Sequence, residues 1–240
     1  WKVGAARLKI TPQEPLWMAG FASRDRPAEG QLHDLWVKVL ALESADGHRG
    51  VVITSDLCGI SKTTYESICR ELETRCGLDR SQIKFTYSHT HSGPALRECL
   101  QDYYAWDDAA RDRVAQYTLA LEKAIVEKIA SALGNMSDAT IWATEGTADF
   151  AVNRRNNDES QIDKLLAGGE PLKGPVDHRV PLLAVRGSDG RLRAVVFGYA
   201  CHTSMLALYE WSGDYAGFAQ LALEEKHPDL QAMFYQACGG

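Results

Sequence analysis

The 240-residue sequence lacks the features that would place it in a membrane or nucleic-acid class. Its longest apolar stretches, such as residues 194–200, are far shorter than the roughly 20 residues that a membrane-spanning helix needs. It carries a net charge of −6, and no block of Lys or Arg interrupts the mixed charges. We therefore expect no transmembrane segment and no electrostatic surface for nucleic acid.

Short signatures of cofactor sites and of targeting are missing too. The chain starts with Trp and shows no charged-then-apolar leader, which leaves its compartment open. No Rossmann or P-loop signature is present. The cysteines lack the C-x-x-C spacing of a zinc site, so we expect buried free thiols, with one or two disulfides as the alternative. There are six: Cys58, Cys69, Cys76, Cys99, Cys201 and Cys238.

What the sequence does contain is an alternation of strand and helix patterns. With 45% hydrophobic and 24% charged residues, it can bury a large core. Segments rich in Val and Ile with a period of two predict strands at residues 36–43, 50–56, 82–88, 140–144, 180–186 and 192–200. Helical spacing predicts helices at residues 61–76, 107–133 and about 214–227.

The connections between these segments are of two kinds. Short ones contain Asp-Gly pairs at residues 46–47 and 189–190, which are typical of hairpin turns. Others are long crossovers that contain a helix. The mixture predicts an α/β fold with a mixed β-sheet flanked by helices, in a single domain over residues 1–240. Residues 153–175 are polar, Gly-rich and aperiodic, so we expect a surface loop that serves as a lid or binding loop.

The segment YSHTHSGP, residues 87–94, places two histidines at the end of a predicted strand. Side chains two positions apart in an extended segment point to the same side, so His89 and His91 would address one point. Zinc binds imidazole nitrogens and, in catalytic sites, keeps one position for water. By spacing alone, a structural role at the strand end, with the imidazoles bonded to loop carbonyls, is favoured over metal binding.

A second strand also ends in a histidine with hydroxyl neighbours, in the segment YACHTSM, residues 199–205. Two strands that finish in this way can bring their histidines to one edge of the sheet, where α/β proteins usually build their sites. His202 thereby becomes a candidate zinc ligand, and the metal site is expected at the C-terminal ends of the strands. Alternation turns Cys201 to the opposite face, which favours a packing role for its thiol.

Other polar residues are weaker candidates for the site. Asp56 ends a predicted strand and either orients a ligating imidazole or caps a turn. Arg154 in VNRRN can bind an anionic or carbonyl oxygen through its guanidinium, although adjacent arginines on a polar loop are usually solvated. His33 and His178 each lie beside an Asp and before a strand, and either is a site residue or a turn residue.

Several ordered blocks of the sequence resemble the N-terminal, catalytic region of the neutral/alkaline non-lysosomal ceramidase family. The blocks are VGAARLKITP, MAGFASR, SDLCGI, SHTHSGPA, AVNRR, YACHTSM and SGDYAGFAQ, and together they span nearly the whole chain. The resemblance implies hydrolysis of the amide that links a fatty acid to a sphingoid base. It also favours a secreted or periplasmic protein.

The resemblance also implies roles for individual residues. His89 and His202 would bind zinc, His91 would face the substrate or the zinc-bound water, and Arg154 matches the arginine of the family's N-R-S-P motif. Here the motif is N-R-R-N, so its surroundings differ. The family's other two zinc ligands, a Glu and a Tyr, and a serine motif would follow Gly240, so we expect a chain that is truncated at its C-terminus.

Together these observations predict a zinc-dependent hydrolase that cleaves an amide bond, with ceramide as one candidate substrate. Zinc would make a hydroxide available near neutral pH, His91 would act as acid/base with help from Arg154, and Asp56 would hold the surrounding shell. Two alternatives stay open. One is a metal-dependent hydrolase of a carbohydrate-linked or peptide-like amide or ester, and the other is a non-catalytic binding domain on the same fold.

Overall fold

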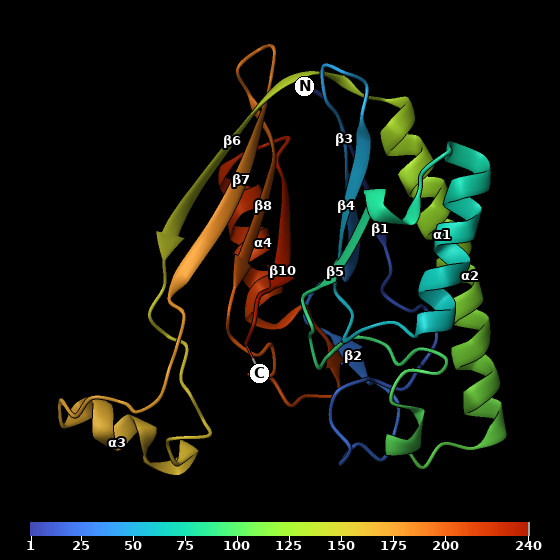
Figure 1. The fold of residues 1–240 in the computed structure, drawn as a ribbon. Helices are drawn as coiled ribbons and strands as arrows, with labels where there is room; N and C mark the ends of the chain where they lie inside the picture. Colours follow the sequence, from blue (N-terminus) through green and yellow to red (C-terminus); the bar gives the residue numbers. More distant parts are fainter. Residues whose placement is uncertain (240) are drawn as a thin grey trace.

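The computed structural model describes residues 1–239 and has two half-sheets packed face to face between helices (Figure 1). The eight main strands follow the order β10-β8-β7-β6-β1-β3-β4-β5. Only two residue pairs, Lys2 with Asp138 and Val3 with Ser137, link β1 to β6 in the middle of this order. At its two ends, β10 lies in contact with β4 and β5. The sheet therefore folds back on itself at the weak β1–β6 link.

The first half-sheet contains β1 (Lys2–Lys9), β3 (Trp36–Glu43), β4 (Arg49–Ser55) and β5 (Ile83–Tyr87). The β1–β3 and β3–β4 pairs are antiparallel, and the β4–β5 pair is parallel. A parallel pair needs a crossover, which is supplied here by α1 (Lys62–Cys76). Ser61 caps the start of α1 by accepting from Thr64 N, and Gly77 ends it with a φ of 65°.

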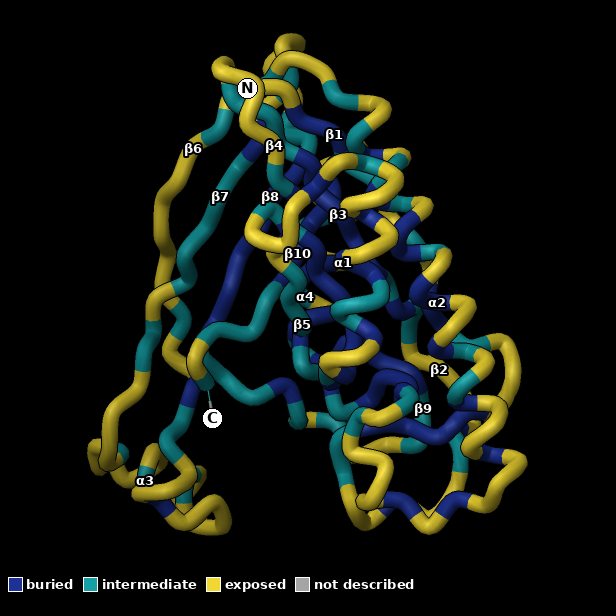
Figure 2. Tube along the Cα trace, turned by 45° about the vertical axis from the view of Figure 1, so that its right-hand side comes forward, coloured by how far each residue is buried: buried dark blue, intermediate teal, exposed yellow. Residues whose placement is uncertain are grey.

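The second half-sheet contains β6 (Ser137–Thr147), β7 (Arg179–Gly187), β8 (Leu192–Tyr199) and β10 (Gln231–Gln236). Its β6–β7 and β7–β8 pairs are antiparallel, while β8 and β10 are parallel and connected through α4 (Asp214–Lys226). Most of β6 is exposed, in contrast to β8 (Figure 2). A small separate sheet pairs β2 (Gly30–Gln31) with β9 (Glu210–Trp211).

Three clusters of buried side chains hold these layers together. The largest lies between the first half-sheet and the helices α1 and α2 (Asp108–Gly134), and Val39, Ile53, Ile68 and Ile125 are members of it. A second joins the other half-sheet to α4 through Phe197, Phe234 and Ala216. The third lies between the half-sheets and includes Leu40, Val196 and Met233. Alternate residues of β3 and β8 thus serve different clusters, as the period of two requires.

The predicted α/β class, with a mixed sheet flanked by helices, is confirmed. All six predicted strands and three predicted helices are present, with shifts at their ends. The main strands β1 and β10 were not predicted, and neither were the two-residue strands β2 and β9. The segment of β1 contains Gly4, Ala5 and Ala6, which do not give a strand pattern. Gly4 is required because a Cβ there would lie 1.9 Å from the carbonyl oxygen of Ala132 in α2.

The loop predicted at residues 153–175 projects from the end of the β6–β7 pair (Figure 1). It is less irregular than expected, because it contains a 3-10 turn at Glu159–Gln161 and α3 at Ile162–Ala167. The buried amide of Asn157 donates to the carbonyls of Asn153 and Lys173 and so closes the loop at its base. Its role as a lid or binding loop stays a prediction.

The six cysteines are free thiols, but the expectation that they are buried holds for only two of them. Cys58 and Cys69 are buried, whereas Cys238 is exposed. Among the helices that the structure describes, none is long and apolar enough to cross a membrane.

Candidate metal centre and active site

The candidate site lies where four strands in two parallel pairs end. Residues after β4 and β5 come from the first half-sheet, and residues after β8 and β10 come from the second. The two strands of each parallel pair end at the same edge of the sheet. Open α/β sheets usually bind ligands at the edge formed by the C-terminal ends of their strands. Because β10 contacts β4 and β5, the two edges form one region.

Three imidazoles meet in this region. The ring centroids of His89 and His202 are 4.7 Å apart, those of His91 and His202 are 4.8 Å apart, and those of His89 and His91 are 5.2 Å apart. His91 and His202, 111 residues apart in sequence, bring their Nε2 atoms to 2.9 Å. The structure thus unites all three histidines that the sequence singled out.

Two of the rings are oriented through their Nδ1 atoms. His89 Nδ1 donates to the carbonyl oxygen of Cys58 at 2.6 Å, and His202 Nδ1 donates to that of Gly239 at 3.4 Å. A carbonyl can only accept, so each neutral ring carries its proton on Nδ1 and keeps a lone pair on Nε2. A backbone carbonyl behind an imidazole is the usual way in which a metal-binding histidine is oriented.

His91 is held differently. Its Nδ1 is buried and has no hydrogen-bond partner among the described residues. With the lone pair of His202 on Nε2, the 2.9 Å contact is a hydrogen bond in which His91 Nε2 donates. The orientation of His91 therefore does not come from an Nδ1 hydrogen bond.

The electrostatic surroundings favour neutral imidazoles. Burial, followed by the charges of His202, His89, Arg24 and Arg154, lowers the pKa of His91 to about 4. Burial and the charge of His89 also lower the pKa of His202, with a smaller contribution from Arg154. Neutral imidazole is the form that binds metal, so the lowered pKa values are compatible with metal binding near neutral pH.

Cys58 also lies at the site, although no sequence pattern pointed to a role for it there. Its thiol, His89 and His91 offer possible ligand atoms that all lie within 4.8 Å of one another. Burial raises the pKa of the thiol to about 12. His89 already uses Nδ1 for the Cys58 carbonyl, so it presents Nε2 to a ligand. The only signal for Cys58 in the sequence was its place two residues after Asp56, at a strand end.

Buried hydroxyl groups fasten together the loops that carry the histidines. Thr203 Oγ1 donates to the carbonyl oxygen of Ser88, and the backbone N–H of His91 donates to that of Thr203 at 3.1 Å. On the other side, Thr90 Oγ1 donates to the carbonyl oxygen of Ser212 at 2.7 Å. All of these hydroxyl side chains are fully buried. The hydroxyl neighbours in both histidine segments thus link one half-sheet to the other.

A cavity of about 440 Å³ opens beside the histidines at the ends of β5 and β10. His89 and His202 line it, whereas His91 lies beside them and packs edge-on against Phe21 at 4.8 Å. Its other lining residues are Phe85, Thr86, Tyr87, Gln236, Ala237 and Gly239. Phe85 and Tyr87 stack with ring centroids 5.4 Å apart, which gives the cavity an aromatic wall next to the imidazoles.

The two remaining predicted site residues are placed farther out. The buried carboxylate of Asp56 accepts from Trp36 N at 2.9 Å and from Gln220 Nε2 at 3.4 Å, rather than from one of the three imidazoles. Burial raises its pKa. Arg154 is exposed on the loop after β6, yet its charge contributes to the lowered pKa of His91 and His202. Arg154 thus acts on the imidazoles through its charge rather than through a hydrogen bond, and Asp56 supports the strand end.

The other histidines considered in the sequence lie outside the cluster. His33 Nε2 contacts the hydroxyl of Ser212 at 3.1 Å and accepts from Gly213 N at 3.3 Å, so it stabilises the segment before α4. The backbone carbonyl of His178 accepts from Ala148 N at the open end of the β6–β7 pair.

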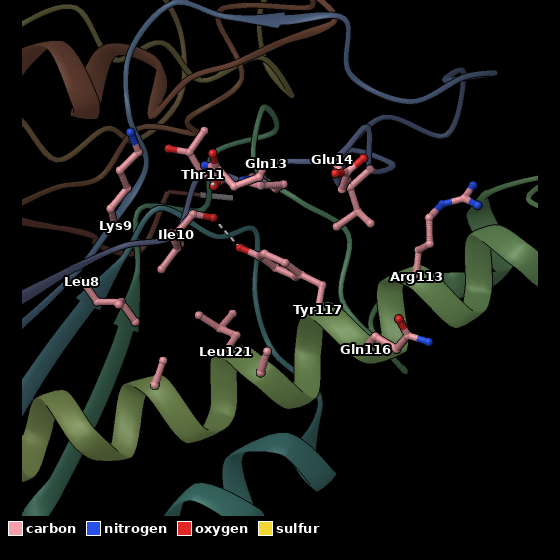
Figure 3. A pocket seen from close by; sticks show the side chains of 14 residues that line it. Leu8, Lys9, Ile10, Thr11, Gln13, Glu14, Arg113, Gln116, Tyr117 and Leu121 are labelled. Carbon is pink, nitrogen blue, oxygen red and sulfur yellow. Dashed lines mark hydrogen bonds between the residues drawn. The ribbon is translucent and has the colours of Figure 1, made fainter.

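A second cavity, of about 420 Å³, lies between the end of β1 and α2 (Figure 3). Its wall is apolar, with Leu8, Ile10 and Leu121, and the hydroxyl of Tyr117 donates to the carbonyl oxygen of Ile10. Neither histidine nor cysteine is among the described residues that line it. This cavity is therefore apolar and separate from the three imidazoles at the strand ends.

Comparison with known families and structures identifies the family of the chain. The family model described as neutral/alkaline non-lysosomal ceramidase, N-terminal, matches residues 1–236. The chain belongs to this ceramidase family. The resemblance predicted from the sequence blocks is thereby confirmed. A search of curated proteins gave no match.

Two solved structures share the fold. A neutral ceramidase from Pseudomonas aeruginosa is 22% identical with a TM-score of 0.78, and a ceramidase complexed with C2 is 21% identical with a TM-score of 0.76. In both cases the alignment covers 100% of this chain and 38% of the other. The chain thus spans well under half the length of these ceramidases, and it adopts the same fold over that part.

Proposed function

We propose that this chain supplies two zinc ligands and an acid/base group to a hydrolase that cleaves the amide bond of an N-acyl sphingoid lipid. The observation that carries the proposal is the meeting of His89, His91 and His202 at the ends of parallel strands. Family membership supports the ceramide-type substrate. The proposal covers a part of the catalytic machinery, since the chain spans 38% of the ceramidase structures it matches.

The histidine cluster fits zinc in its donor chemistry. His89 and His202 each carry a lone pair on Nε2, fixed by a carbonyl behind Nδ1. In this structure the lone pair of His202 accepts from His91 Nε2, and zinc would take the place of that hydrogen bond. Imidazole nitrogens are preferred zinc ligands, and the lowered pKa of His202 keeps its nitrogen free of a proton at neutral pH. Bound zinc would polarise the amide carbonyl and lower the pKa of a water molecule towards neutrality.

His91 is suited to proton transfer beside these ligands. Its Nε2 lies 2.9 Å from His202 Nε2, so it reaches the space that His202 faces. A general acid/base must lie within hydrogen-bonding reach of the reacting group, and His91 meets that requirement for a group held next to His202. Arg154 adds a positive charge that would stabilise a developing oxyanion. Asp56 acts at a distance, by fixing the start of β3 and the end of β4.

The cavity beside the site suits a substrate with an apolar portion. The stacked rings of Phe85 and Tyr87 form one side, while Thr86 and Gln236 add polar groups near the imidazoles. An amide could place its polar carbonyl towards the histidines and an attached hydrocarbon segment against the aromatic wall. This arrangement supports an amide with a lipid portion over a fully polar one.

Metal analysis of the intact protein tests the proposal. We expect about one zinc per chain in the wild type, and a loss of zinc affinity of at least 100-fold in His89→Ala and His202→Ala. The matched control is His48→Ala, because His48 is exposed on the turn between β3 and β4. Unchanged zinc content in both site variants would refute the ligand assignment.

Substrate assays then separate the alternatives. We expect hydrolysis of ceramide and a loss of turnover, with zinc retained, in His91→Ala. Activity restricted to polar amides or esters would favour the hydrolase of non-lipid substrates. A protein that binds zinc but hydrolyses neither class would support the non-catalytic binding domain instead.

A further inference from the structure

Three residues that showed no functional signal in the sequence contact His91. They are Gly20, Phe21 and Arg24. They belong to the segment MAGFASR, which follows β1 at a distance of several residues. This segment runs alongside the histidine loop: Met18 forms a β-bridge with Pro94, and Ala19 N donates to the carbonyl oxygen of Gly93 at 2.9 Å. The two segments therefore keep a fixed relative position.

Gly20 touches the imidazole so closely that no side chain fits. A Cβ at this position would lie 2.3 Å from Cγ of His91 and 2.7 Å from its Cα. Gly20 also has a φ of 104°, a conformation that other residues rarely adopt. Its backbone N–H donates to the hydroxyl of Tyr104 at 2.9 Å, which fixes the peptide against the ring.

Phe21 and Arg24 complete the contact. The ring of Phe21 meets that of His91 edge-on, at 4.8 Å and 75°. Arg24 is 5% exposed, and its Nη1 donates to the carbonyl oxygens of Ala19 at 2.7 Å and His91 at 2.5 Å. Its Nη2 donates to the carbonyl oxygen of Leu208, on the segment after His202, at 2.9 Å. A single guanidinium thus joins three segments around the site.

These contacts replace the hydrogen bond that His91 lacks. His89 and His202 are oriented by carbonyls behind Nδ1, but Nδ1 of His91 has no partner among the described residues. We propose that Gly20, Phe21 and Arg24 are positioning residues, which set the imidazole of His91 by packing and by anchoring its peptide. The inference rests on the proposed function of His91, because a fixed ring is needed for proton transfer at one point.

Kinetics of Gly20→Ala in the intact protein test this role. A misplacement of about 1 Å can lower a rate about 100-fold, so we expect kcat to fall by about 10- to 100-fold, with little change in KM and with zinc content retained. The control is Gly47→Ala. Gly47 has a similar positive φ of 85°, but nothing lies within 4 Å of an added Cβ, so its kcat should stay at the wild-type value.

A double-mutant cycle separates positioning from general damage. If Gly20 acts through His91, Gly20→Ala should have almost no effect on kcat in a His91→Ala background. Additive losses in the two variants would overturn the proposal, and so would a parallel loss of zinc, because the ligands His89 and His202 are outside these contacts.

Nuclear magnetic resonance supplies a readout that does not depend on activity. In the wild type we expect nuclear Overhauser effects between the Phe21 ring and the His91 imidazole. Phe21→Leu, which leaves the backbone of Gly20 intact, should shift the imidazole resonances of His91 more than those of His89. If His89 shifts equally, or if the Phe21 contact is absent, the positioning role is refuted even when hydrolysis is observed. If the contact is present and the protein hydrolyses nothing, the positioning role stands and the proposed function fails.

Discussion

The two half-sheets contribute unequally to the site and to the core. The first supplies His89 and His91 from one loop, and two long helices cover its outer face with the largest buried cluster. The second supplies His202 alone, its outer layer is α4, and most of β6 is exposed. A site divided in this way requires the two halves to stay in register. The contacts between the halves therefore matter more to the site than either core does.

A largely buried ion pair joins the two halves. Lys38 of β3 is 2% exposed, and its Nζ lies 2.7 Å from Glu224 Oε1 in α4. It also donates to the carbonyl oxygen of Ala232 in β10 at 2.8 Å. Glu224 in turn accepts from the backbone N–H of Ala232 at 3.0 Å. Charge and backbone bonds together thus attach the first half-sheet to α4 and the edge of β10.

Removal of this lysine should have the largest effect on stability. Lys38→Ala leaves Glu224 in a mostly buried site without its main partner, and we expect a loss of about 3–5 kcal/mol in the free energy of unfolding. Denaturant unfolding measures it. The control is Lys2→Ala, because the Lys2–Glu43 pair is exposed at Lys2 and lies within one half, so the loss should be below about 1 kcal/mol. Equal losses would contradict the special role of the contact between the halves.

The hydroxyl contact between the histidine loops should matter less. Thr203→Val keeps the side-chain shape but removes the donor to the carbonyl oxygen of Ser88, so we expect a loss of about 1–3 kcal/mol. Because this bond joins the segments of His89 and His202, zinc affinity should fall as well. Thr74→Val is the control, since its exposed hydroxyl bonds only within α1. A stability loss with unchanged zinc affinity would separate the two effects and weaken the link that we draw.

The exposed strand of the second half should be the most tolerant. Trp142 of β6 is 49% exposed, so Trp142→Thr removes a ring that is already half in water while keeping strand propensity. We expect a change of at most about 1 kcal/mol in stability and none in zinc content. A loss comparable with that of Lys38→Ala would show that the outer strand supports the site after all.

Much of the fold could be predicted from local patterns. The helical spacing in α1, α2 and α4 and the alternation in β3 and β8 are short-range signals, and signals of this kind predicted the three longer helices and six of the eight main strands. The strand β1 could not be predicted in this way, because its glycine is required by helix packing. Gly4 allows β1 to lie close to Ala132 of α2, which is far along the chain. Strand propensity, which depends on local residue types, does not contain information about such a tertiary contact.

The candidate site also has features that the sequence shows and features that only the structure shows. The H-x-H spacing and the strand-end position of His202 are visible in the sequence, and family membership is carried by its motifs. The carbonyl of Cys58 behind His89 and the missing partner of His91 are not visible, because backbone groups leave no trace in residue identity. From the sequence, Asp56 was as well suited to orient an imidazole as to cap a turn. In the structure, its carboxylate accepts hydrogen bonds from Trp36 N and Gln220 Nε2.

The sequence by itself thus determined the class of fold, most of the main elements and the kinds of ligand atoms, since these depend on periodicity, capping and side-chain chemistry. Tertiary structure alone decided that His202 meets His89 and His91, because β10 had to close against β4 and β5 before the two strand ends became one region. It also decided how each ring is oriented. Two rings are set by carbonyls and one by packing, and that depends on segments that approach only when the chain folds.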